Sequence, residues 1–222
     1  VRSGAKLNDE QKTAIRALNE EHSKLTNQFS QNLLAETRNI AVVVDTVEEL
    51  DGLSPAQITS AANAAKERGL EGKYLLSITN TTRQPILTSL NNREVRQRVW
   101  EASANRAQSG EFNNTEIVSR LAQLRAERAK LLGYDNWAAY TLENNMAQNP
   151  KAVFDMLGSM VPAVVENTLK EQEAIQAMIR EKGGDFDVQP WDWEYYAEFV
   201  RQAKYDLDEN EVKKYFEFNR VL

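Results

Sequence analysis

The residue types that most often carry proton transfer and metal binding are scarce in this chain of 222 residues. It has no cysteine and a single histidine, His22. Without cysteine, the sequence excludes disulfide bonds, thiolate catalysis and cysteine-ligated zinc sites. His22 falls on the apolar stripe of an expected helix, and no second histidine can cooperate with it. We therefore interpret His22 as a packed side chain with one satisfied ring nitrogen, rather than as a ligand or a base.

Carboxylates are abundant, with 33 Asp and Glu residues, but no pair of them is singled out. Most alternate with Lys and Arg, which is typical of a solvated helix face. The segment DLDENEVKKYFE (206–217) places oxygen-bearing side chains at several ligand positions of a calcium-binding EF-hand loop. Where that loop needs glycine for its sharp turn, this sequence has Glu211. A helix N-cap at Asp208 with Glu211 three residues later explains the segment, so no calcium site is predicted.

An aromatic cluster in the segment WDWEYYAEFV (191–200) is the strongest candidate for a binding surface. On a helix its side chains fall on two faces, which favours burial between two layers of structure. The functional alternative is an aromatic wall that lines a ligand groove. The candidate channel-wall residues on that alternative are Trp191, Trp193, Tyr195 and Tyr196. The sequence contains no phosphate-binding loop, nucleophile elbow or kinase motif, so no catalytic and no metal-binding residue is assigned.

The elements that must position these residues are mostly helices. Apolar periodicity and capping residues predict helices at 9–38, 54–69, 85–91, 93–108, 114–132, 136–147, 150–182, 191–204 and 209–222. Two short apolar runs, near 39–45 and 73–80, predict strands that pair as a minor β element. The predicted fold class is therefore mainly α, a multi-helix array with this small β element. A weak internal boundary is expected near 81–92, where the strand signals cease.

The overall composition limits the partners. A net charge of −6 argues against nucleic acid, because proteins that bind it concentrate Lys and Arg. No apolar run approaches the roughly 18 residues that cross a bilayer, so no membrane partner is expected. The segment VRSGAKLNDE (1–10) does not resemble a secretion leader. The compartment stays open between a cytoplasmic location, which we favour, and a periplasmic or exported one.

Several stretches, taken together in their order and spacing, resemble a known family. In the second half they are NTTRQPIL (80–87), NREVRQRVWEASANRA (92–107), LRAERAKLLGYDNWAAYTLENNMAQNP (124–150) and QPWDWEYYAEFVRQAKYDLDENEVKKYFEFNRVL (189–222). In the first half, LNEEHSKLTNQFSQNLLAET (18–37) resembles the long helix before the family's first strand. The chain is similar to the thimet-oligopeptidase-like zinc metallopeptidases and, among them, to the bacterial peptidyl-dipeptidases, also called dipeptidyl carboxypeptidases.

The resemblance implies a mostly helical, two-lobed enzyme whose deep channel admits short peptides and removes C-terminal dipeptides. Zinc in such an enzyme is held by an HExxH helix and a further Glu, and it activates water. Because this chain has one histidine, the resemblance implies that residues 1–222 are one non-catalytic helical segment of the larger peptidase. Zinc would belong to the intact enzyme and not to this chain, which should be inactive alone. The implied partners are the remainder of its own polypeptide and short peptide substrates.

An alternative hypothesis is a self-contained helical protein-binding or scaffold module without enzymatic activity. The predicted helix at 209–222 bears on this choice, because its apolar stripe would be exposed in a segment taken from a larger enzyme. We therefore expect non-native self-association through 209–222, which size-exclusion chromatography with light scattering would detect. A self-contained module should instead be monodisperse.

Overall fold

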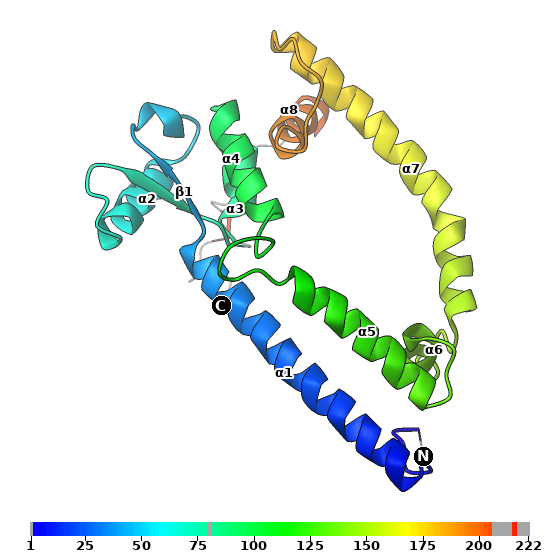
Figure 1. The fold of residues 1–222 in the computed structure, drawn as a ribbon. Helices are drawn as coiled ribbons and strands as arrows, with labels where there is room; N and C mark the ends of the chain where they lie inside the picture. The colour runs from blue at the N-terminus through cyan, green and yellow to red at the C-terminus, as the bar shows by residue number, and fades with distance from the viewer. Residues whose placement is uncertain (1, 80, 206–214, 217–222) are drawn as a thin grey trace. The chain divides into compact units, whose positions relative to one another are not determined.

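A computed structural model describes residues 2–79, 81–205 and 215–216, which form eight α-helices and two short strands (Figure 1). The elements are α1 (Asp9–Asn39), β1 (Ala41–Val44), the 3-10 helix η1 (Glu48–Leu50), α2 (Pro55–Glu67), β2 (Tyr74–Ser77), α3 (Arg83–Ser89), α4 (Arg93–Ala104), α5 (Thr115–Leu131), α6 (Trp137–Leu142), α7 (Pro150–Glu181) and α8 (Trp193–Tyr205). The predicted fold class, mainly α, is confirmed. The predicted helix at 209–222 lies outside the described residues except for Tyr215 and Phe216, so self-association there stays a prediction.

The chain divides into two compact units, which are described separately. The first unit combines Val1–Ile40 with Asn105–Glu166, and the second combines Ala41–Ala104 with Asn167–Leu222. Each unit is thus assembled from two stretches that are far apart in the sequence. The internal boundary suggested near 81–92 stays a prediction.

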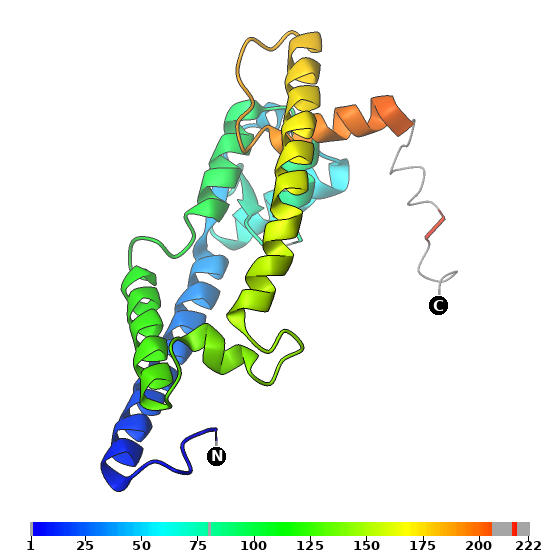
Figure 2. The same ribbon diagram turned by 90° about the vertical axis from the view of Figure 1, so that its right-hand side faces the viewer.

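The first unit is built on α1, which packs along α5 (Figures 1 and 2). Helix α1 starts with a capping box, because the side chain of Asn8 accepts a hydrogen bond from the Gln11 backbone at 2.8 Å and the Gln11 side chain accepts from the Asn8 backbone at 3.1 Å. Asn114, which is 4% exposed, joins the two helices. Its amide nitrogen donates to the Phe29 carbonyl at 3.1 Å, and its oxygen accepts from Asn32 at 3.0 Å. A buried amide with both groups satisfied fixes the register of the pair.

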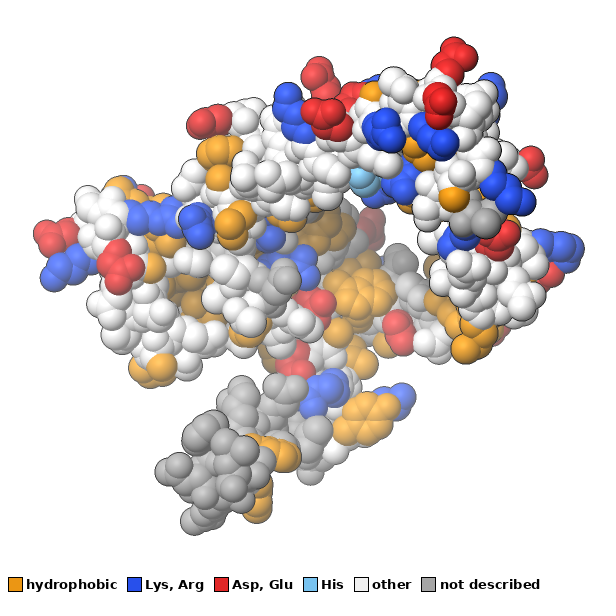
Figure 3. All heavy atoms as spheres, turned by 90° about the horizontal axis from the view of Figure 1, so that it is seen from below, with side chains coloured by type: hydrophobic (Ala, Val, Ile, Leu, Met, Phe, Trp, Pro, Cys, Tyr) orange, Lys and Arg blue, Asp and Glu red, His pale blue; other side chains and the backbone are white. Residues whose placement is uncertain are grey.

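His22 lies on α1 and is partly buried, which agrees with a packed side chain, while the predicted hydrogen bond of one ring nitrogen stays a prediction. Its Nε2 atom is buried and has no hydrogen-bond partner among the described residues. Burial lowers the pKa of the imidazole below 6.5, and the positive charges of Arg125 and Arg128 lower this pKa further. Figure 3 shows the histidine (pale blue) beside basic side chains. The imidazole is therefore neutral at pH 7, as a side chain packed beside cations should be.

We expect His22 of the folded chain to titrate below 6.5 when its ring protons are followed by NMR. Because this folded-state pKa lies below that of the unfolded chain, the unfolded state takes up a proton first as the pH falls. The free energy of unfolding should therefore decrease as the pH drops through 6.5 and level off below the folded pKa. His22→Gln should remove this part of the slope. A midpoint at or above 6.5 would contradict the assignment.

The second unit contains the predicted β element. β1 and β2 pair in antiparallel fashion with Val42 opposite Leu76, and both of these side chains are buried. Helix α2 packs against β2 and buries Ala61 and Ala65, whose small side chains permit a close approach. The strands are separated in sequence by η1 and α2, so they pair around the intervening helix as expected.

Two predicted helices end earlier than their sequence patterns suggest. The helix predicted at 93–108 ends at Ala104, because Ala107 adopts a φ of 55° that no right-handed helix can contain. The helix predicted at 136–147 ends at Leu142 and is followed by a tight turn, in which the Asn145 backbone donates to the Leu142 carbonyl at 2.8 Å. By contrast, α7 stays helical across Pro162.

Candidate functional site

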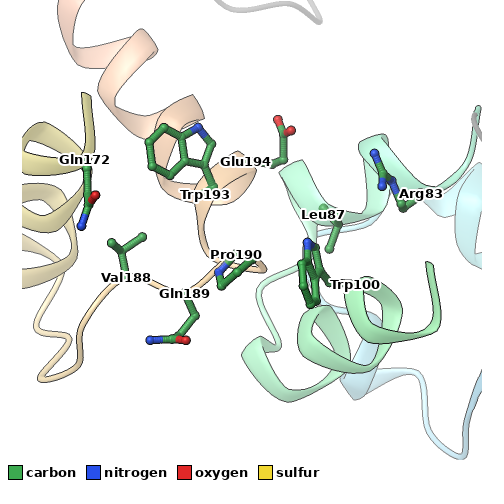
Figure 4. Close-up of a pocket in the computed structure, with 9 residues that line it drawn as sticks. All are labelled: Arg83, Leu87, Trp100, Gln172, Val188, Gln189, Pro190, Trp193 and Glu194. Carbon is green, nitrogen blue, oxygen red and sulfur yellow. The ribbon is translucent and has the colours of Figure 1, made fainter. Parts of the chain in front are cut away.

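A pocket of about 440 Å³ lies within the second unit (Figure 4). Side chains from α3, α4, α7 and α8, and from the loop that joins the last two helices, form its wall. The lining residues are Arg83, Leu87, Trp100, Gln172, Val188, Gln189, Pro190, Trp193 and Glu194. In Figure 4, Gln172 and Trp193 lie on one side of Pro190, and Trp100 and Leu87 lie on the other.

The loop between α7 and α8 is held in place by the side chain of Gln176. Its amide nitrogen donates to the Phe186 carbonyl at 2.9 Å, and its oxygen accepts from the Val188 backbone at 2.9 Å. The loop leaves α7 at Gly183, whose φ of 83° ends the helix. These bonds fix the backbone from which Val188 and Pro190 reach the pocket.

Of the four aromatic candidates, only Trp193 lines this pocket. Trp191 supports the pocket indirectly, because its ring packs edge-on against Trp100 with 6.0 Å between centroids. The Nε1 atom of Trp191 is buried and has no hydrogen-bond partner among the described residues. A contact between these side chains and a substrate stays a prediction.

Tyr195 and Tyr196 are not among the lining residues. Tyr196 is 8% exposed and forms a core with Ile175 and Ile179 of α7. The Tyr195 hydroxyl donates to Asn91 at 2.7 Å, and the Arg96 guanidinium stacks 4.0 Å from its ring centroid. Burial raises the pKa of the Tyr195 hydroxyl above 10, although the Arg96 charge opposes the rise, so this hydroxyl keeps its proton and acts as a donor. Tyr196 is thus buried between α7 and α8, whereas Tyr195 is only partly buried.

The most tightly bonded group near the pocket centres on Asp192, which the sequence analysis did not single out. Its fully buried carboxylate accepts from Arg93 Nε and Nη2, at 2.9 and 2.8 Å, and from Arg96 Nη2 at 3.2 Å. Arg96 is 1% exposed and also donates to the carbonyls of Leu90 and Asn91, at 2.8 and 3.0 Å. Asp192 immediately precedes α8, so the cluster binds the start of α8 to α4. A lone Asp between two tryptophans was the signal for it, because a charge among large apolar residues needs a buried partner.

The lining residues suit binding rather than bond cleavage. The two indole rings and neighbouring aliphatic groups offer apolar surface, while the amides of Gln172 and Gln189 can donate and accept hydrogen bonds. Arg83 and Glu194 add one charge of each sign, and Arg83 also donates to Ser103 at 3.2 Å. Apolar walls with a few polar groups are typical of sites that hold a small or extended ligand.

The described part of the chain offers neither a metal site nor a membrane span. Among residues 2–79, 81–205 and 215–216, no three or more His, Asp or Glu side chains gather where they could hold a metal ion. These residues therefore do not fit a zinc ion. Within the same ranges, no helix has the length and apolar character that a bilayer crossing requires.

Comparison with known proteins gives a consistent set of peptidases. The pattern of peptidase family M3 matches residues 86–222. The whole chain aligns at 41% identity with the dipeptidyl carboxypeptidase of Escherichia coli and at 42% with that of Salmonella typhimurium, covering 33% of each. It is 30% identical to oligopeptidase A of Escherichia coli over 90% of this chain and 30% of that protein. The chain thus spans about a third of the length of these relatives.

The helical fold and these relatives point to a family of peptidases of mainly α architecture. More specifically, the chain belongs to peptidase family M3, a family of metallopeptidases that in general depend on zinc. The resemblance inferred from the sequence stretches is confirmed.

Proposed function

We propose that this chain is the non-catalytic helical part of a zinc-dependent peptidase that removes dipeptides from the carboxyl ends of short peptides. The observation that carries the proposal is the identity of 41–42% to two dipeptidyl carboxypeptidases over the whole chain, against 29–30% to the oligopeptidases. A non-catalytic role is supported by the single histidine, because an HExxH helix needs two.

In this proposal the pocket of the second unit is part of the surface that receives the peptide. Trp193 supplies an apolar wall, and the amides of Gln172 and Gln189 are available to the peptide backbone. Trp191 and Tyr195 act indirectly, because their contacts with Trp100 and Asn91 hold the wall in place. In this proposal the zinc chemistry belongs to the rest of the enzyme.

The experiment that tests the proposal transplants this chain into a relative. Residues 1–222 replace the aligned third of the Escherichia coli dipeptidyl carboxypeptidase, and the product is assayed on an N-blocked tetrapeptide with a free carboxyl end. We expect the chimera to release the C-terminal dipeptide and a chelator to abolish this activity, whereas the 222-residue chain alone leaves the peptide intact. Within the chimera, Trp193→Ala should raise KM by about tenfold with little change in kcat.

A matched control carries the aligned third of Escherichia coli oligopeptidase A, which is 30% identical to this chain, in the same host. It should be less active than the chimera, because its surface is adapted to a different catalytic partner. Hydrolysis by the 222-residue chain alone would contradict the proposal, as would a folded chimera without activity. If, in addition, the chain alone were monomeric and unfolded cooperatively, a self-contained binding module would be the better explanation.

A further inference from the structure

Helix α7 carries a line of large apolar side chains in contact with solvent. Phe154, Leu157, Val161 and Val165, which we call the α7 stripe, are 72, 45, 53 and 52% exposed. They are three or four residues apart, so they lie on one side of a helix that continues without interruption from Pro150 to Glu181 (Figure 2). Every residue from 154 to 174 is exposed. An apolar surface of this extent marks an interaction site in a soluble protein.

The same side of α7 is buried where a neighbouring helix covers it. Ile175 and Ile179 continue the spacing of the stripe, 14 and 18 residues beyond Val161, and are 2 and 0% exposed. They pack with Tyr196 of α8 in one hydrophobic cluster. This face of α7 is therefore apolar in two stretches, and among the described residues only the second stretch, with Ile175 and Ile179, has its helix partner.

The exposed part of α7 is expected to be weakly stable without another element packed against it. Most helical stability in proteins comes from packing of the apolar face rather than from helix propensity. Pro162 removes one backbone hydrogen bond from the middle of this stretch, and β-branched residues such as Val161 and Val165 lower helix propensity further. An element packed along the stripe would supply the helix stability that the local sequence does not provide.

We propose that the α7 stripe is the docking surface for an apolar helical face in the other two thirds of an M3 peptidase polypeptide. This inference rests on the proposed function, because it takes the chain as one part of a larger enzyme. The chain covers 33% of the dipeptidyl carboxypeptidases it matches, and α7 lies inside the region that the family pattern matches. The four stripe residues carry no charge, so the surface that covers them is apolar too.

A second copy of this chain is a poorer occupant. The stripe runs over 11 residue steps, which is about 17 Å of helix. Symmetric pairing of so short a stripe buries much less than the roughly 1,600 Å² of a standard specific interface. The other part of a large enzyme can add further contacts on either side of the stripe.

The absence of cysteine makes chemical labelling a direct test, because an introduced cysteine is the only thiol in the chain. Val161→Cys places a thiol on the stripe. Ser159→Cys is the matched control, since Ser159 is also exposed but lies about 160° away around the helix. Both variants are made in the 222-residue chain and in the Escherichia coli chimera, and maleimide labelling of the site is followed by mass spectrometry.

In the isolated chain both thiols should react at similar rates. In the chimera Val161→Cys should react at least about tenfold more slowly, because the core of a packed interface excludes solvent, while Ser159→Cys is unchanged. Fast labelling of Val161→Cys in a folded chimera overturns the docking surface, even if that chimera is active. Slow labelling in the isolated chain, together with a dimer in light scattering, overturns it in favour of a second copy.

The two proposals fail in different ways. A folded but inactive chimera in which Val161→Cys is protected overturns the proposed function and supports the docking surface. If the chimera does not fold, the same pair of cysteines is placed at the aligned positions of the full-length Escherichia coli enzyme. Protection of the stripe thiol there, with free reaction of the control thiol, supports the docking surface, and equal reaction of both overturns it.

Discussion

Replacing Asp192 with alanine is expected to lower the free energy of unfolding by about 3–5 kcal/mol, the usual effect of removing one member of a buried ion pair. The substitution leaves the guanidinium of Arg96, which is 1% exposed, without its counter-ion. Arg93 suffers less, because its side chain is 36% exposed and can be solvated. Urea unfolding followed by tryptophan fluorescence measures the change, since three of the four tryptophans, Trp100, Trp191 and Trp193, belong to the second unit. A loss below about 1 kcal/mol would contradict the assigned role.

Two further variants separate charge from packing. Asp45→Ala removes a partner of Lys73, at 2.7 Å, in a pair whose side chains are 72 and 48% exposed. It should leave the unfolding midpoint close to that of the unsubstituted chain, because exposed pairs contribute little. The double variant Arg96→Met with Asp192→Leu removes both buried charges and should recover much of the stability lost in Asp192→Ala. If it is no more stable than Asp192→Ala, packing rather than charge explains the loss.

Gly52→Ala is expected to destabilise the second unit by about 3 kcal/mol or more, because the added methyl group meets backbone and not a movable side chain. Gly52 has a φ of 96°, and a Cβ built there lies 2.1 Å from the Ser89 carbonyl oxygen and 3.0 Å from the Asn91 nitrogen. The carbonyl of the neighbouring Asp51 accepts a hydrogen bond from the Asn91 backbone at 2.8 Å, and this bond keeps the chain at Gly52 close to residues 89–91. Relief of the clash therefore requires that this bond break. Thermal unfolding measures the effect.

Gly69→Ala is the matched control for this substitution. Gly69 also has a positive φ, 73°, but no atom of the described residues lies within 4 Å of a Cβ built there. Its alanine variant should suffer only the strain of the left-handed backbone, about 1–2 kcal/mol. Equal losses in the two variants would show that backbone strain alone is responsible and that the approach to Ser89 is unimportant.

Helix starts were predictable because their signals are local. The capping boxes that open α1 and α2, at Asn8 and Ser54, each need only a partner three residues later, and both are present in the structure. The early end of α4 was not predictable in the same way. Ala107 has a positive φ although it is not glycine, and nothing in its neighbours indicates this conformation.

The candidate site was only partly predictable, because it depends on contacts between distant segments. The aromatic run was recognised as important, but the sequence does not reveal which of its faces meets α3 and α4. The ion pair between Arg93 and Asp192 determines which face meets these helices, and its two residues are 99 positions apart in the sequence. The pocket consequently receives Trp193, while Tyr196 turns into the core with α7. Local periodicity carries no information about such long-range pairing.

The distance along the chain between Arg96 and Asp192 also has a consequence for synthesis. Asp192 is synthesised 96 residues after Arg96. During that interval the nascent polypeptide already contains β1, β2 and α4. The guanidinium of Arg96 can then donate to backbone carbonyl groups but has no carboxylate of Asp192 to pair with. We therefore expect the first part of this unit to enclose the Arg96 side chain only after Asp192 has been synthesised.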